Sequence, residues 1–85
     1  MSALHEYIAN WDPMNFISEG APRDEYNSEA EEIIRLFKHD MDEDQVGELI
    51  YRVFLDFMEI DPKGFKEDCY KRAGEIKDLL NDRLK

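Results

Sequence analysis

The sequence is poor in the features that mark a secreted or membrane protein. It contains one cysteine, Cys69, so no disulfide can form within the chain, as is usual in a reducing compartment such as the cytoplasm. No apolar run approaches the roughly 20 residues that cross a bilayer as a helix, and no basic segment followed by an apolar stretch opens the chain. We therefore expect a cytoplasmic protein without a membrane partner.

Patterns typical of β-strands are also lacking, because no segment alternates β-branched and polar residues. Only three prolines and four glycines interrupt the 85 residues, and apolar side chains recur between them at helical spacing. The indicated fold class is all-α, with residues 1–85 forming a single domain. We expect a compact bundle of three long helices plus a short N-terminal helix, with an irregular loop over 12–27.

The apolar spacing predicts helices over four segments, which are 3–11, 29–39, 43–58, and a last one that starts between 62 and 65 and ends at 83. Two starts have a capping box, in which a cap residue and the residue three positions later exchange hydrogen bonds. The pairs are Ser28 with Glu31 and Asp42 with Gln45. The helix over 43–58 is the most apolar, so we expect it at the centre of the bundle.

Two Asp-Pro pairs suggest further helix starts, because proline is well tolerated in the first turn after a capping aspartate. Asp12 with Pro13 predicts a short helical turn over 15–17. Asp61 with Pro62 predicts the start of the last helix.

Some positions carry structural expectations only. Gly47 and Gly74 lie inside predicted helices, where glycine costs about 1 kcal/mol relative to alanine, so we expect a neighbouring element close to each. Cys69 falls on the apolar stripe of the last helix. The buried stripe of the 43–58 helix is expected to comprise Val46, Leu49, Ile50, Val53, Phe54 and Phe57.

Basic residues are scarce over most of the chain. The 21 acidic and 11 basic side chains give a net charge of −10. Residues 1–61 hold 16 acidic and 4 basic side chains, whereas 62–85 hold 5 acidic and 7 basic. Such a surface repels nucleic acid and anionic membranes, and it attracts cations and basic proteins.

A calcium loop is suggested by acidic residues that alternate after position 40, but its pattern is incomplete. The sixth position of such a loop requires glycine, and here it is Gln45. The twelfth requires a bidentate glutamate, and here it is Tyr51. Helix capping explains the same residues better.

Other chemistry finds little support. His5, His39 and Cys69 fall on three different predicted helices, so they do not suggest a transition-metal site. Cys69 fits a small core residue better than a nucleophile. There is no glycine-rich phosphate loop and no basic patch free of acids. We therefore expect no enzymatic activity, no metal and no cofactor.

The segment 11–26 is the least regular part of the chain and gathers aromatic, acidic, proline and arginine residues. Irregular loops on helical scaffolds often carry recognition. The alternative is that Trp11, Phe16 and Tyr26 cover the open end of the bundle.

Part of this segment also carries a resemblance. The run Trp11-Asp12-Pro13, followed by Ala21-Pro22-Arg23-Asp24-Glu25-Tyr26 and a glutamate-rich helix, resembles the YugE-like family of small bacterial proteins over nearly the whole chain. The resemblance implies a helical fold and a bacterial origin. The family has no established function, so it implies no activity and no site residues.

A second similarity is one of class alone. In length, acidity and helical content the chain is similar to the small immunity proteins that block bacterial nuclease toxins. Those proteins place acidic side chains and tyrosines against a basic cleft. The Tyr-Tyr-Pro motif of the colicin nuclease group is absent here.

The function that we expect is a non-enzymatic, acidic protein-binding module, of which an inhibitor or immunity-type protein is the sharper form. Its partner is a protein with a basic surface. Aromatic anchors and charges that steer association form the predicted site. The predicted residues are Trp11, Arg23, Asp24, Glu25, Tyr26, Glu29, Glu32, Asp42, Glu43, Asp44 and Tyr51. The alternative is a self-associating, homodimeric structural domain.

Overall fold

Four helices make up the regular structure of residues 3–59 and 61–83, the part of the chain that the computed structural model describes. They are α1 (Ala3–Trp11), α2 (Asn27–Leu36), α3 (Glu43–Met58) and α4 (Phe65–Arg83), and these residues form no strand. The predicted all-α class is therefore confirmed. The lengths are 9, 10, 16 and 19 residues, so the bundle has two long and two short helices rather than three long ones.

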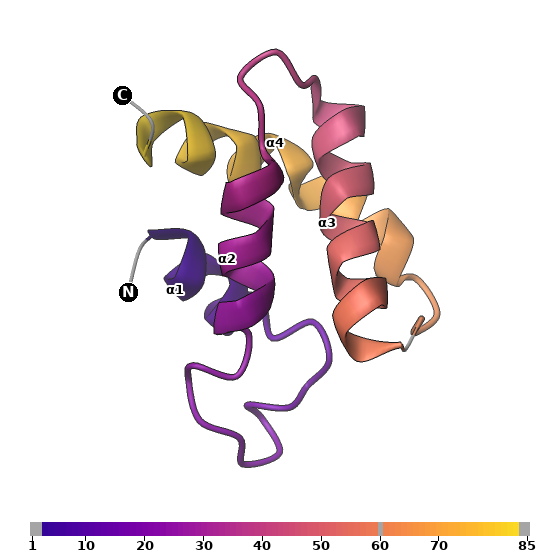
Figure 1. The fold of residues 1–85 in the computed structure, drawn as a ribbon. Coiled ribbons are helices and arrows are strands. Elements are labelled where there is room, and N and C mark those ends of the chain that lie inside the picture. The colour runs from indigo at the N-terminus through magenta and orange to yellow at the C-terminus, as the bar shows by residue number, and fades with distance from the viewer. Residues whose placement is uncertain (1–2, 60, 84–85) are drawn as a thin grey trace.

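The helices pack in a small, dense arrangement. Figure 1 shows α2 and α3 side by side and running in opposite directions, while α4 crosses behind them. The most extensive contact joins α3 to α4, and α1 packs on both α2 and α4. The radius of gyration is 12.0 Å, which is close to the value of about 12 Å for a compact chain of this length.

The core lies around α3, as its apolar sequence predicts. Val46, Ile50, Val53 and Phe54 are buried there. They meet a continuous stripe on α4, whose buried members are Phe65, Cys69, Ala73, Ile76 and Leu80. One position of the expected α3 stripe is wrong, because the side chain of Phe57 is 48% exposed.

Both glycines inside helices lie at close contacts, as predicted. A Cβ at Gly47 would lie 3.1 Å from Cγ and 3.2 Å from Cα of Tyr70, so this glycine brings α3 and α4 together. A Cβ at Gly74 would collide with Oε1 of Glu43. Gly47 therefore helps α3 to approach α4 closely, whereas the contact at Gly74 is with the flexible end of the Glu43 side chain.

The start of α3 has the predicted capping box. The carboxylate of Asp42 accepts a hydrogen bond from the amide of Gln45 at 2.8 Å, and the amide of Asp42 donates to Oε1 of Gln45 at 2.9 Å. Such caps contribute about 1 kcal/mol. The boundaries of α3 agree with the predicted 43–58.

The predicted boundaries of α2 are wrong at both ends. The helix begins at Asn27, so Ser28 lies inside it and forms no capping box with Glu31. Tyr26 occupies the cap position without a side-chain cap, because its ring is buried in the core. The helix ends at Leu36, and Phe37 then turns to extended backbone with its own side chain buried.

Neither Asp-Pro pair starts a helix. Asp12 has a φ of 50° and donates its amide to the carbonyl of Ile8 at 2.8 Å, so it ends α1. Turns follow over 12–26 in place of the short helix expected over 15–17. α4 begins at Phe65, after the turn that contains Pro62.

Candidate functional site

The 12–26 loop is held by the buried carboxylate of Asp12. Its Oδ2 accepts hydrogen bonds from the amide and the hydroxyl of Ser18, at 2.8 and 2.6 Å. Its Oδ1 accepts from the amide of Ile17 at 3.1 Å and from the hydroxyl of Tyr26 at 2.5 Å. Burial by itself would raise the pKa of Asp12, but these donors outweigh it and hold the pKa at about 2.

Tyr26 ties this network to the core and is unavailable as a surface anchor. Only 2% of the residue is exposed, and its ring packs on Phe16 and Phe54. Its hydroxyl also accepts from the amides of Met14 and Phe16 at 3.2 and 3.4 Å. The prediction of Tyr26 as an exposed partner anchor is therefore wrong, because its ring is packed in the core.

Trp11 and Tyr51 are half-buried, and both pack against the ring of Phe65 in the core. The centroid of Trp11 lies 5.9 Å from that of Phe65, and the centroid of Tyr51 lies 6.0 Å from it. The guanidinium of Arg72 lies 4.8 Å above Trp11, and the hydroxyl of Tyr51 donates to Asp61 at 2.8 Å. Both rings therefore have structural partners.

Arg23 links the loop to α1. Its Nη2 donates to Oδ1 of Asn10 at 2.8 Å and to Oε2 of Glu6 at 3.1 Å. Both charged side chains of this ion pair are about half exposed, so the bond orients the loop more than it stabilises the fold.

The predicted acidic residues do not form one face. Asp24 and Glu25 lie in the loop before α2, whereas the acids of 42–44 lie at the start of α3. Figure 1 places these segments at the opposite ends of α2. All five side chains are exposed, so acidity is spread over the molecule.

Glu29 is buried instead of exposed. Only 4% of the residue is accessible, and its Oε2 has no hydrogen-bond partner among the described residues. Burial raises the pKa of Glu29, and the nearby charge of Glu25 raises it further, although a bond to its own backbone amide opposes them. Its prediction as an exposed steering charge is therefore wrong.

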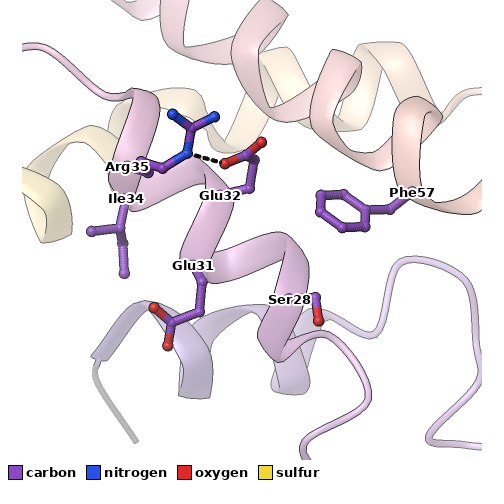
Figure 2. A pocket seen from close by; sticks show the side chains of 6 residues that line it. All are labelled: Ser28, Glu31, Glu32, Ile34, Arg35 and Phe57. Carbon is purple, nitrogen blue, oxygen red and sulfur yellow. Dashed lines mark hydrogen bonds and ion pairs between the residues drawn. The ribbon is translucent and has the colours of Figure 1, made fainter.

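Two large apolar side chains lie exposed, Phe57 in the last turn of α3 and Leu36 at the end of α2. Phe57 is 48% exposed and Leu36 is 36% exposed. Figure 2 shows Phe57 pointing from α3 towards α2 beside Glu32 and Ser28, and an open hollow of about 600 Å³ lies along these residues. We call the surface formed by Glu32, Leu36 and Phe57, with the buried Glu29 beneath it, the α2–α3 face.

Of these four residues, sequence reasoning identified only Glu29 and Glu32 as functional. Phe57 follows Ile50 and Val53 at core spacing, so periodicity assigns it to the interior. It lies in the last turn of α3 opposite Ser28 and Glu32, and nearly half of the residue stays exposed there. The signal available in the sequence for the exposure of Phe57 was the proximity of the acidic residues Asp56 and Glu59.

The residues with potential catalytic chemistry are separated. His5 lies 3.2 Å from Glu31 and His39 lies 3.1 Å from Asn81, while burial raises the pKa of the Cys69 thiol to about 12. Within residues 3–59 and 61–83, no three histidine, cysteine or acidic side chains are grouped so as to hold a metal ion.

No helix in the described part of the chain is both long and apolar enough to cross a membrane. Comparison with known protein families, with curated proteins and with solved structures found no match. The resemblance to the YugE-like family therefore stays a prediction.

Proposed function

We propose that this protein is a non-enzymatic, acidic protein-binding module whose partner presents a basic surface. The observation that carries the proposal is the exposure of Phe57 and Leu36 beside carboxylates on a chain of net charge −10. A few residues, among which aromatic side chains and arginine are enriched, provide most of the binding energy of an interface. Surrounding charge accelerates association and selects partners of the opposite sign. The sharper form of the proposal is an inhibitor or immunity-type protein.

The perturbed ionisable groups support a non-enzymatic role. Asp12 and Tyr26 are engaged with each other and with backbone amides in the loop. Cys69 is buried with a raised pKa, so a reactive thiolate is disfavoured at neutral pH. These groups stabilise the fold, and none of them lines the open hollow near Phe57.

The test is retention of a partner by the immobilised protein. Extract of the native host is passed over the column at about 50 mM salt, and bound proteins are eluted with increasing salt. The proposal requires a basic protein that elutes as salt rises and then forms a complex of defined stoichiometry with the purified chain. If no protein from the extract forms such a complex, the proposal fails.

Self-association is the second candidate, and the exposed ring of Phe57 favours it. Two copies related by a twofold axis would cover both rings. The charge of −10 on each copy opposes this pairing, most strongly at low salt. Analytical sedimentation distinguishes a monomer from a dimer, because a mass of 10.1 kDa at all protein concentrations excludes the dimer.

A further inference from the structure

The α2–α3 face alternates apolar and acidic groups. Positions 29, 32 and 36 lie on one flank of α2, because they are spaced by three and four residues. Phe57 reaches this flank from α3 beside Glu32, as Figure 2 shows. An occupant of this face therefore meets an aromatic ring, a carboxylate and an exposed leucine.

The chain's own Arg35 shows that a guanidinium can bind here. Its Nε donates to Oε1 of Glu32 at 2.5 Å, within the hollow that Phe57 also lines. The Arg35 side chain is 66% exposed. An ion pair as exposed as this one contributes little stability, so a guanidinium from another protein can replace Arg35.

Glu29 lies beneath this face and favours a cation above it without touching that cation. The residue is only 4% exposed, and its Oε2 is inaccessible to solvent and has no hydrogen-bond partner in the described part of the chain. A buried carboxylate in this state is unfavourable unless it is protonated or compensated by a cation. Glu29 precedes Glu32 by three positions on the same flank, so a guanidinium held at Glu32 lies within one helical turn of it.

We infer that the α2–α3 face receives an arginine side chain, carried by an amphipathic segment of the partner protein. This inference rests on the proposed function and names the surface and the chemistry that it uses. Arginine fits better than lysine, because its planar guanidinium stacks on an aromatic ring while it bonds to a carboxylate. Apolar residues beside that arginine cover Leu36 and the rest of the Phe57 ring.

The probe is a labelled synthetic helical peptide of 14 residues with leucines along one face and arginines elsewhere. Two further peptides serve as comparisons, one with lysine in place of every arginine and one with serine in place of every leucine. Binding is measured by fluorescence anisotropy, and the contact surface is mapped from backbone amide shifts in NMR spectra. We expect the arginine peptide to bind most tightly and to shift Glu32, Leu36 and Phe57.

Variants of the face identify the groups responsible. Phe57→Ala is expected to weaken the arginine peptide about tenfold, which corresponds to about 1.4 kcal/mol. Glu32→Gln is expected to weaken it by several-fold, whereas Asp24→Asn removes the same charge elsewhere and changes little. Circular dichroism confirms that each variant is folded.

A matched pair of arginine variants tests the replacement directly. Arg35→Ala removes the ion pair of Glu32, and Arg52→Ala removes the corresponding pair of Glu48 on α3, where Glu48 still accepts a hydrogen bond from Tyr70. Both variants lose one positive charge. Only Arg35→Ala is expected to tighten binding of the arginine peptide beyond this shared charge effect, by about two- to threefold.

Three results overturn the inference: equal affinity for the arginine and lysine peptides, equal effects of the two arginine variants, or an unchanged affinity of Phe57→Ala. The proposed function survives any of them if the host extract still provides a basic partner. If the extract provides no such partner, the proposed function fails whatever the peptides do, and both fail if the peptides also give one of these three results.

Discussion

Replacement of Asp12 by asparagine tests how the 12–26 loop is held. The variant keeps the size of the side chain. It removes the negative charge of the carboxylate, whose oxygens accept hydrogen bonds from Ser18 and Tyr26. The pKa of Asp12 is about 2, compared with an ordinary value of 3.8. A tenfold change in acidity corresponds to about 1.4 kcal/mol, so ionised Asp12 contributes roughly 2 kcal/mol at neutral pH.

The effect depends on pH with a defined sign. Because folding lowers the pKa of Asp12, the contribution is complete above about pH 5 and is lost as pH falls towards 2. Urea unfolding followed by circular dichroism at pH 7, 5 and 3 measures it. We expect Asp12→Asn to lower the free energy of unfolding by roughly 2 kcal/mol at pH 7 and by roughly 1 kcal/mol at pH 3.

Asp24→Asn is the control, since it makes the same chemical change on an exposed residue of the same loop. Its unfolding free energy should stay within about 0.5 kcal/mol of the parent chain. Equal losses for the two variants at pH 7 would refute the role given to Asp12. A loss that is the same at pH 7 and pH 3 would refute the electrostatic explanation.

Three further predictions concern single positions. Glu29→Gln should stabilise the protein at pH 7, because folding raises the pKa of Glu29 and stability therefore falls as pH rises through its titration. Urea unfolding at pH 4 should show a smaller gain in the free energy of unfolding than at pH 7. No gain at either pH contradicts the burial of an ionised Glu29. Cys69 should react slowly with a thiol reagent in the folded protein and rapidly in urea, since it is buried with a pKa of about 12; fast labelling without urea contradicts this. Gly64→Ala should lower the melting temperature, because a φ of 83° costs a residue with a side chain about 1 kcal/mol or more, and an unchanged melting temperature contradicts the strained turn.

The elements predicted best are those that local interactions define. Asp42 and Gln45 exchange hydrogen bonds across three residues, so the start of α3 follows from the sequence alone. The start of α2 did not follow, because Tyr26 is held by Asp12, which lies 14 positions earlier. No local pattern around Ser28 reports that contact.

The site was predicted less well than the fold, because exposure depends on which element covers a side chain. Glu29 and Glu32 occupy neighbouring turns of one helix, yet one is buried and the other borders an open hollow. Phe57 shares its spacing with Val53, yet it is half exposed. Such differences depend on how α2 and α3 are placed relative to each other, which the spacing within one helix does not specify.

The sequence by itself determined the helical class, the acidic charge, the limits of α3 and the close contacts at Gly47 and Gly74. Periodicity, capping and residue size are local properties, and they are encoded within a few turns. Only the tertiary structure decided that Asp12 holds the loop, that Glu29 is buried, and that Phe57 is left exposed beside Glu32. These outcomes depend on contacts between separate helices and loops, whose geometry no single segment specifies.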